Sequence, residues 1–360
     1  MKTNLQIPPK KKVFFVLSSL TSGGSERVFW SLTQGINKQQ YDIALVILNS
    51  KVTCFSTDLD QVRIIDLNTG KASRSFFALY KLFKEEKPYA VFSTMGHMNI
   101  LISLVAVFLR NIIFVARVSN VPTEHIQYET LKSKFYALFA KWSYKAFNII
   151  VCQTEDMRQA IKMMYKVNDQ KTVVIPNPVV ETQQLKVLQN SIVYKLIVVA
   201  RFSREKGLDR LIDVFSRLPS NYHLSMVGIG VLEEEIRNKV RQLGLDDRVK
   251  FFGEIKNVPE ILVQHDLMVL SSYTEGFPNV VAEALAVGLP VVTFKVSGVK
   301  ELIKDGFNGY VVPQDDLAGF RSKIIQACTN TSWNFKAIKD DVYRKFNLEK
   351  ISEEYEQLIN

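Results

Sequence analysis

Short apolar runs alternate with helical patterns along nearly the whole chain, and this alternation is the feature that most restricts the fold. The runs VFFVLSS at 13–19 and DIALVIL at 42–48 have the length and β-branched content of buried strands. The segment FFALYKLFKEE at 76–86 has helical periodicity. Strands that alternate with helices form parallel sheets through right-handed crossovers. The sequence therefore predicts a doubly wound α/β fold.

The alternation is interrupted once, which predicts two domains. The first series ends in IPNPVV at 175–180, and a polar segment without periodicity follows at 181–191. Strand-like runs resume at 194, and a chain of 360 residues exceeds what one hydrophobic core usually holds. We expect an N-terminal Rossmann-like domain at 1–180 and a C-terminal one at 181–345. Two such domains that face each other would enclose a cleft.

Composition is that of an ordinary globular protein, with 47% hydrophobic and 23% charged residues. The cysteines Cys54, Cys152 and Cys328 lie far apart, so we expect no disulfide and a reducing cytoplasm. The four histidines form no zinc motif. The basic start of the chain leads into a first strand rather than a secretion signal. The apolar stretch at 100–109 is too short to span a bilayer and is expected to be a buried helix.

The positive charge is concentrated in the N-terminal half. Residues 1–190 contain 24 Lys and Arg against 13 Asp and Glu, whereas the remainder has a net charge of −1. Such a surplus suits an anionic membrane surface or an anionic substrate. The surplus of positive charge could also serve only to keep the protein soluble. The chain has no zinc finger, no RRM-like pattern and no dense arginine tract, so a nucleic-acid partner is not expected.

Residues that directly follow strands are the candidates for ligand binding, because open parallel sheets bind ligands at the carboxyl ends of their strands. Gly23 and Gly24 follow the first strand and allow close approach to the backbone. Arg201 and Lys206 follow the first strand of the second domain, where they could clamp a diphosphate. Gly228 lies in a similar loop. Taken singly, each feature also fits an ordinary turn or a surface charge.

Two glutamates flank a Gly-Phe-Pro-Asn turn in SYTEGFPNVVAEALAVGLPVV at 272–292. Pro278 suits the first position of a helix, and such a helix directs unpaired N–H groups at an anion or a hydroxyl-rich ligand. Glu275 precedes the turn and Glu283 lies in the helix, where carboxylates can each accept bonds from vicinal hydroxyls. Without further motifs, the two glutamates would more readily be interpreted as solvated surface residues than as ligand contacts.

Together these motifs resemble the retaining GT-B glycosyltransferases of the glycosyltransferase family 4 type. The resemblance covers most of 13–360 and is strongest at 195–315. It rests on the following segments: Arg201 to Lys206-Gly207, VGIG at 227–230, FFGEI at 251–255, Glu275 and Glu283, GGSERV at 23–28, and SGVKELIKDGFNGYVV at 297–312. It implies a twin Rossmann-like fold, with the nucleotide-sugar held mainly by the C-terminal domain and the acceptor by the N-terminal domain. It also implies a last helix, at 346–360, that returns to the N-terminal domain.

The resemblance further implies roles for individual residues. Arg201 and Lys206 would bind the donor diphosphate, Glu275 would meet the donor sugar, and Glu283 would meet the ribose hydroxyls. The expected catalytic residues are Glu275, Arg201, Lys206 and His97. Further donor contacts are expected from Gly23, Gly24, Gly228, Ile255, Gly276, Phe277, Pro278, Asn279 and Val280. Acceptor contacts are expected from His97, Arg117 and Asn120.

The chain departs from the family pattern at two positions. Ala200 stands where relatives usually carry a glycine before the arginine, which is a mild change. Val118 stands where many relatives carry a histidine. His97, close to another strand end, could replace that histidine, or it could be a structural contact at a helix N-terminus.

The resemblance implies a retaining hexosyltransferase (class 2.4) that moves a sugar from a nucleotide-sugar, expected to be UDP-linked, to a polyprenyl-diphosphate-linked glycan. No cofactor and no metal are expected, since no DxD-type motif lies at a donor loop. A catalytically silent nucleotide-sugar-binding subunit is the alternative from another class. A different GT-B-like enzyme, such as a UDP-sugar epimerase or a phosphorylase, is the third possibility.

Basic and aromatic residues are interleaved at 71–87 and at 128–147, which predicts docking on the inner face of the cell membrane. The basic members are Lys71, Arg74, Lys81, Lys84, Lys87, Lys132, Lys134, Lys141 and Lys145. The alternative is that most of the aromatic side chains belong to the core. Lipid-linked acceptors of the family support docking.

Overall fold

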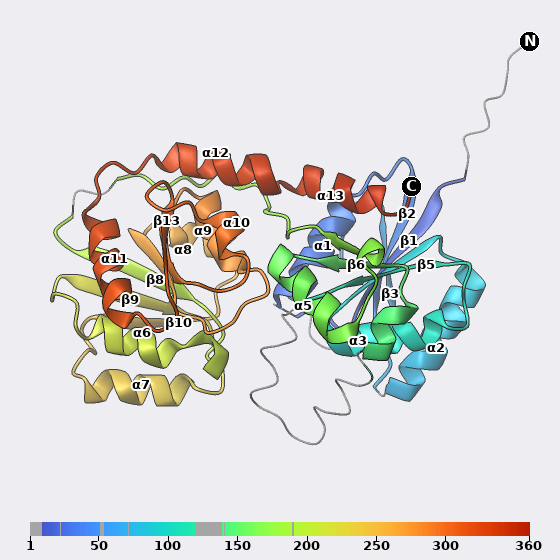
Figure 1. Ribbon diagram of the computed structural model, residues 1–360, viewed down its shortest axis with the longest axis horizontal. Helices are drawn as coiled ribbons and strands as arrows, with labels where there is room; N and C mark the ends of the chain where they lie inside the picture. The colour runs from blue at the N-terminus through green and yellow to red at the C-terminus, as the bar shows by residue number, and fades with distance from the viewer. Residues whose placement is uncertain are drawn as a thin grey trace, which may run out of the picture. The chain divides into compact units, whose positions relative to one another are not determined.

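The computed structural model describes residues 9–21, 23–50, 54–70, 72–119, 139, 141–188 and 191–360. The chain divides into two compact units (Figure 1). Unit 1 comprises Met1–Pro178 and Leu348–Asn360, and unit 2 comprises Val179–Asn347. The units divide after residues 178 and 347, and the sequence led us to expect domain boundaries after residues 180 and 345.

A sheet of seven parallel strands forms the centre of unit 1, in the order β3-β2-β1-β4-β5-β6-β7 (Figure 1). The strands are β1 (Lys11–Leu17), β2 (Tyr41–Ile47), β3 (Val62–Asp66), β4 (Ala90–Thr94), β5 (Ile113–Arg117), β6 (Ile149–Cys152) and β7 (Thr172–Val174). The order reverses between β1 and β4, so the loops that follow these two strands flank the topological switch point.

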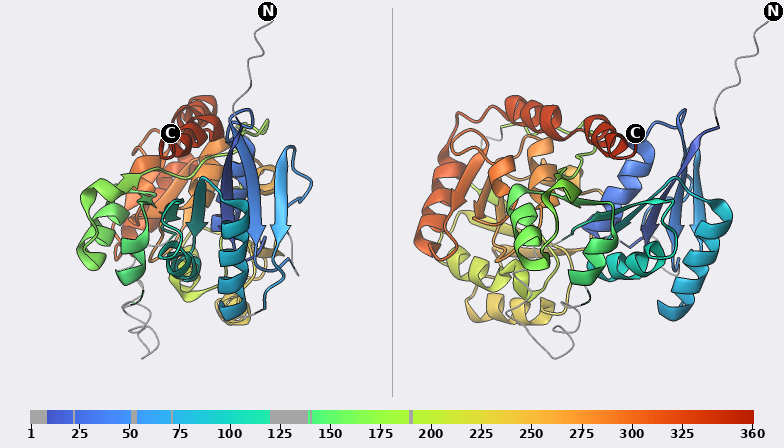
Figure 2. Two further views of the ribbon diagram at one scale, coloured as in Figure 1. Left: turned by 90° about the vertical axis from the view of Figure 1, so that its right-hand side faces the viewer. Right: turned by 45° about the vertical axis from the view of Figure 1, so that its right-hand side comes forward.

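Helices cover both faces of this sheet. One face packs against α2 (Ala72–Glu86), α3 (Gly96–Ala106) and α5 (Glu155–Tyr165). The other face packs against α1 (Gly24–Gly35) and α13 (Leu348–Gln357), and Figure 2 shows these two helices beside each other. Residues 100–106 of the apolar stretch form the second half of α3, which is largely buried as expected, whereas Val107 and Phe108 lie beyond the helix and are exposed. In the ranges that the structure describes, no helix is long and apolar enough to cross a membrane.

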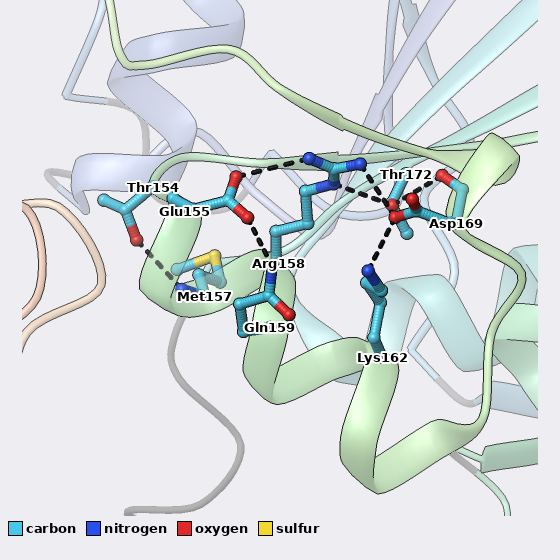
Figure 3. Close-up of polar contacts among 8 residues, drawn as sticks. All are labelled: Thr154, Glu155, Met157, Arg158, Gln159, Lys162, Asp169 and Thr172. Atoms are coloured by element: carbon cyan, nitrogen blue, oxygen red, sulfur yellow. Dashed lines mark hydrogen bonds and ion pairs between the residues drawn. The ribbon is translucent and has the colours of Figure 1, made fainter.

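Helix α5 is tied to the edge of the sheet by polar contacts (Figure 3). The Oγ1 of Thr154 caps the helix by accepting from a backbone N–H at 3.1 Å. Arg158 Nη2 and Lys162 Nζ lie 2.7 and 2.8 Å from Asp169 Oδ1, and Arg158 Nε donates to Thr172 on β7 at 3.1 Å. The hydrogen bond from Lys162 and the nearby cations lower the pKa of Asp169. These contacts fix the short strand β7 at the sheet edge.

Unit 2 repeats the plan with six parallel strands in the order β10-β9-β8-β11-β12-β13. They are β8 (Tyr194–Val199), β9 (Tyr222–Val227), β10 (Val249–Gly253), β11 (Leu267–Leu270), β12 (Val291–Phe294) and β13 (Gly309–Val312). One face packs against α6 (Leu208–Phe215), α7 (Glu233–Gln242) and α11 (Leu317–Thr329). The other packs against α8 (Val258–Leu262), α9 (Asn279–Ala286), α10 (Val299–Leu302) and α12 (Phe335–Phe346).

The prediction of two Rossmann-like α/β domains is therefore confirmed. One strand, β3 at Val62–Asp66, was not predicted, because only part of it is buried at the sheet edge and its apolar run is short. Pro278 is the residue before α9 rather than its first helical residue. Of the helix expected at 128–147, residues 128–138 and 140 lie outside the described ranges, and 141–146 are helical.

His265 lies between α8 and β11, and its burial there can be tested by measuring the free energy of unfolding at different pH values. Its ring is buried, with Nδ1 2.7 Å from the carbonyl of Ile261 and Nε2 2.8 Å from Ser225 Oγ. Burial lowers the pKa of His265, against the opposing effects of the Ile261 bond and Asp266. The unfolded chain thus binds the proton more readily, and the free energy of unfolding should decrease as pH falls through about 6.5. Urea denaturation at pH 7.5 and 5.5 should show this decrease, and His265→Gln should reduce it; an unchanged decrease would contradict the assignment.

Candidate functional site

Lys206 and Glu275 meet at the carboxyl end of the unit 2 sheet. Lys206 ends the 3-10 turn Arg204–Lys206 after β8, and Glu275 lies in the loop between β11 and α9. Lys206 Nζ is 2.7 Å from Glu275 Oε1, and the two side chains are 22% and 12% exposed. The hydroxyl of Ser272 donates to the same oxygen at 2.6 Å. Two residues that the sequence placed in separate motifs therefore form one partly buried ion pair.

Arg201 lies on the same loop as Lys206 and is exposed. Its charge acts on Glu205: burial raises the pKa of this carboxyl, but a hydrogen bond from Ser203 and the charges of Lys206 and Arg201 hold it below its usual value. Arg201 and Lys206 therefore lie close enough to the segment around Glu205 for their charges to act on it. Such a segment at a strand end suits an anionic ligand.

Two glycines explain how the neighbouring loop approaches Arg201. Gly228 has φ 129°, and a Cβ there would lie 2.0 Å from the carbonyl oxygen of Ala200. A Cβ at Gly230 would lie 2.3 Å from the carbonyl oxygen of Phe202. The loop after β9 thus packs directly on the loop after β8. This packing accounts for both glycines, and the donor contact expected of Gly228 stays a prediction.

The turn before α9 is buried and well packed. Gly276, Phe277 and Pro278 are buried, and α9 begins at Asn279. Gly298 has φ 82° and faces this turn, since a Cβ on it would lie 2.9 Å from Pro278 Cδ. The loop after β12 therefore supports the turn that follows Glu275.

Three further expected donor residues lie near this turn. Val280 and Glu283 are half-buried on α9, and Glu283 has an interaction within the protein. Ile255, after β10, packs against the core on the α9 side of the sheet. The expected donor residues of unit 2 thus lie on loops at the carboxyl edge of one sheet and on helix α9. Their contact with a donor stays a prediction.

In unit 1, the loops after β1 and β4 contain a glutamate that sequence reasoning did not single out. Glu26 lies in the first turn of α1, is 7% exposed, and accepts a hydrogen bond from Thr21 Oγ1 at 3.1 Å. Gly23 makes room for it, because a Cβ at Gly23 would lie 2.2 Å from Glu26 Oε2. His97 is exposed at the start of α3; desolvation lowers its pKa, and the charge of Glu26 opposes this. The sequence signal for Glu26 was an acidic residue two positions after Gly24, in the first turn of the helix.

Arg117, at the end of β5, is 2% exposed and bound within unit 1. Its Nη1 donates to Thr94 Oγ1 at 2.9 Å, its Nη2 donates to Asn177 Oδ1 at 2.6 Å, and it also hydrogen-bonds Tyr355 of α13. Desolvation lowers the pKa of Arg117 and raises that of Tyr355 to about 12. An acceptor could touch this guanidinium only if its neighbours moved, so the contact expected of it stays a prediction.

The remaining acceptor positions can be stated briefly. Val118 is buried in the core of unit 1, at the position where many relatives carry a histidine. Asn120 lies outside the described residues. Within the described ranges, no group of three or more His, Cys, Asp or Glu is placed to hold a metal ion.

Comparison with known proteins identifies the class. Two parallel-sheet Rossmann-like units are the GT-B architecture of glycosyltransferases. Residues 22–183 match the family "Glycosyltransferase Family 4", and residues 180–340 match "Glycosyl transferases group 1". The chain therefore belongs to the family 4 type of GT-B glycosyltransferases and is a hexosyltransferase-type enzyme.

Relatives and solved structures of similar length agree with this family. The chain is 24% identical to the GalNAc-alpha-(1->4)-GalNAc-alpha-(1->3)-diNAcBac-PP-undecaprenol alpha-1,4-N-acetyl-D-galactosaminyltransferase of Campylobacter jejuni, over 97% of this chain and 98% of that protein. It is 26% identical to the UDP-Gal:alpha-D-GlcNAc-diphosphoundecaprenol alpha-1,3-galactosyltransferase of Escherichia coli, over 91% of each. The structure of Anabaena HepE in complex with UDP-glucose matches with a TM-score of 0.82 at 18% identity, over 97% of this chain and 99% of that chain.

Proposed function

We propose that this enzyme moves a hexose from a UDP-sugar to a polyprenyl-diphosphate-linked glycan with retention of anomeric configuration. The observation that carries the proposal is the Lys206–Glu275 pair at the strand ends of unit 2, with Arg201 on the same loop. The names of the two relatives above support the acceptor class, since both specify undecaprenol-linked substrates. Both names also specify alpha linkages, which an alpha-linked UDP-hexose gives by retention.

In the proposed reaction, the bond from the anomeric carbon to the donor phosphate breaks while a bond from that carbon to the acceptor hydroxyl forms. The acceptor proton goes to the leaving phosphate on the same face. Arg201 and Lys206 stabilise the charge that develops on the diphosphate, which is a preorganised electrostatic role that requires no metal. Glu275 binds the donor sugar and Glu283 the ribose.

Glu275 is held by two hydrogen bonds to one of its carboxylate oxygens. Lys206 and Ser272 both bond its Oε1, and in the described part of the chain no hydrogen bond falls on Oε2. The second oxygen is therefore available to a sugar hydroxyl. For unit 1 we propose acceptor binding, with His97 at the start of α3 as the first residue to test. The donor contacts expected of Gly23 and Gly24 stay predictions.

A donor screen tests the function. The protein is incubated with a panel of UDP-sugars and an undecaprenyl-diphosphate-linked oligosaccharide, with and without EDTA. Transfer that EDTA does not abolish supports the proposal. Isomerised donor sugar would instead identify an epimerase, and binding of UDP without any turnover would identify a silent subunit. Loss of transfer in EDTA that manganese restores would contradict the metal-free mechanism.

The structure sharpens the membrane proposal, because it separates core aromatics from exposed ones. Phe83 and Phe147 are buried, whereas Phe77 on α2 and Phe108 just after α3 are exposed. Phe76 joins the two exposed rings, with centroids 5.3 Å from Phe77 and 6.3 Å from Phe108. Arg74, Lys81 and Lys84 on α2 and Arg110 after α3 are exposed as well, and Lys81 pairs with Glu85. An apolar patch with a basic rim fits an anionic membrane surface.

Co-sedimentation with vesicles measures this docking. We expect binding to anionic vesicles to exceed binding to neutral ones and to fall as salt rises. The double variant Phe77→Ser/Phe108→Ser should lose roughly a hundredfold or more in vesicle affinity, because each phenylalanine buried in the membrane contributes about 1.5–3 kcal/mol. Val231→Ser, at an exposed residue of unit 2, is the control. Weak and equal binding to both vesicle types would exclude docking.

A further inference from the structure

Arg210 is a buried cation in the first turn of α6. It is 6% exposed, and its guanidinium carbon lies 3.8 Å from the ring centroid of Tyr273 and 4.0 Å from that of Phe294. Its Nε donates to the carbonyl of Ser271 at 2.8 Å, and its Nη2 donates to that of Ser272 at 2.7 Å. A planar guanidinium is suited to such stacking and to fixed, paired hydrogen bonds. Arg210 therefore holds the first residues of the loop that leaves β11.

Gln314 extends this network to two further strand ends. Arg210 Nη1 donates to the carbonyl of Gln314 at 3.0 Å, and Nη2 donates to its Oε1 at 2.9 Å. The amide of Gln314 donates to the carbonyls of Ser272 at 3.2 Å, Tyr273 at 3.3 Å and Lys295 at 3.0 Å. Lys295 follows β12 and Gln314 follows β13. Arg210 and Gln314 thus join the segments that follow β8, β11, β12 and β13.

The residues that Arg210 holds by their carbonyls contact the candidate active site by their hydroxyls. Ser271 Oγ donates to the carbonyl of Lys206 at 2.9 Å, and Ser272 Oγ donates to Glu275 Oε1 at 2.6 Å. The loops meet so closely that Gly207, with φ 57°, has no room for a side chain: a Cβ there would lie 2.4 Å from the carbonyl oxygen of Ser271. Lys206, through its backbone carbonyl, and Glu275, through its carboxylate, are therefore each hydrogen-bonded to a serine whose own carbonyl Arg210 holds.

The charge of Arg210 is not neutralised by a direct ion pair with any described carboxylate, since its hydrogen bonds go to carbonyl and amide oxygens. Burial lowers its pKa, against the opposing effects of Tyr273, Asp209 and Asp315. An arginine keeps its proton under such conditions, because its unperturbed pKa is above 12. Removing a charge from water is costly, and the carbonyl and amide oxygens that bond Arg210 offset part of this cost.

We propose that Arg210 is a positioning residue that sets the geometry of Lys206 and Glu275 through Ser271, Ser272 and Gln314. The proposal rests on the function proposed above for that pair. Lysine at this position keeps the charge but cannot make the same set of directed bonds or stack in the same way. A small displacement of catalytic groups lowers turnover strongly.

The test compares Arg210→Lys with Arg248→Lys. Arg248 makes contacts of the same kind at the amino edge of the same sheet: Nε donates to the carbonyl of Tyr222 at 3.0 Å, Nη2 donates to that of Pro219 at 2.8 Å, and the guanidinium lies over Phe215. For each variant, thermal unfolding, kcat and donor KM are measured, together with hydrogen exchange of the Tyr273 amide, which donates to the carbonyl of Glu205 at 2.8 Å.

We expect Arg210→Lys to lower kcat/KM by about 10- to 100-fold, mostly through kcat, and to speed exchange at Tyr273. Arg248→Lys should leave kcat/KM and the exchange rate at Tyr273 within about twofold of the wild type. It should lower thermal stability about as much as Arg210→Lys does. Equal activity losses in the two variants, or unchanged exchange at Tyr273 in Arg210→Lys, would overturn the proposal.

A replacement variant and a ligand-free measurement complete the experiment. If Arg210→Lys does not fold, Gln314→Ala replaces it under the same criteria, because it removes the bonds to Ser272, Tyr273 and Lys295. A wild-type protein that neither binds UDP nor transfers sugar would refute the proposed function. The exchange comparison in the ligand-free protein would then still decide whether Arg210 fixes the loop.

Discussion

Replacing Lys206 by alanine is expected to lower kcat by roughly 10²- to 10³-fold with the fold retained, because the leaving diphosphate loses a preorganised cation. The ammonium is 22% exposed and 2.7 Å from Glu275, so its removal also leaves that carboxylate with Ser272 as its described partner. Arg201→Ala is expected to act in the same direction, since Arg201 lies on the same loop. Steady-state kinetics at saturating donor measures both.

The chain offers matched controls for these variants. Lys239 Nζ is 2.7 Å from Asp213 Oδ2, a pair of the same length between α7 and α6. Arg204 is exposed two residues before Lys206. Lys239→Ala and Arg204→Ala should therefore leave kcat nearly unchanged. Near-full kcat in Lys206→Ala or Arg201→Ala would show that the diphosphate assignment is wrong.

The fold was predictable because the inner parallel strands of both sheets are covered on both faces and form continuous apolar runs. The strands of both units follow from such runs, as β1 shows with its unbroken burial from Val13 to Leu17. The prediction failed at β3, where a half-buried edge strand at Val62–Asp66 carries only a weak pattern. Local sequence also does not tell which aromatic residues of an amphipathic helix are covered, since Phe83 is buried and Phe77 exposed on the same α2.

The sequence pointed to individual residues of the candidate site where a residue belongs to a short motif, but not to the contacts between residues of different motifs. Lys206 and Glu275 were each recognised, but their ion pair joins positions 69 residues apart and appears only in the fold. The Arg210–Gln314 contact spans 104 residues, and neither residue lies in a motif with a chemical meaning of its own. Glu26 was passed over because a first-turn glutamate is usual at a helix N-terminus, where it complements the dipole. Side chains that support a site leave the weakest sequence signal, since their partners are backbone carbonyls.

Glu275 and Glu283, the two glutamates that flank the Gly-Phe-Pro-Asn turn, are expected to differ in kinetics. Glu275→Ala should lower kcat by about 10²-fold with little change in donor KM, because contacts at the sugar strengthen as charge develops there in the transition state. Glu283→Ala should mainly raise donor KM, because contacts to the ribose are the same in the ground state and the transition state. Glu275 sits at the centre of a preformed contact with Lys206 and Ser272, which is the arrangement that transition-state stabilisation requires.

The control for this pair is Ser272→Ala, which removes one bond to Glu275 Oε1 and leaves the carboxylate itself. We expect it to lower kcat in the same direction as Glu275→Ala but less, since Lys206 still holds the same oxygen. A rise in donor KM for Glu275→Ala together with a fall in kcat for Glu283→Ala would exchange the two roles. The sugar would then lie against α9, and the ribose against the loop after β11.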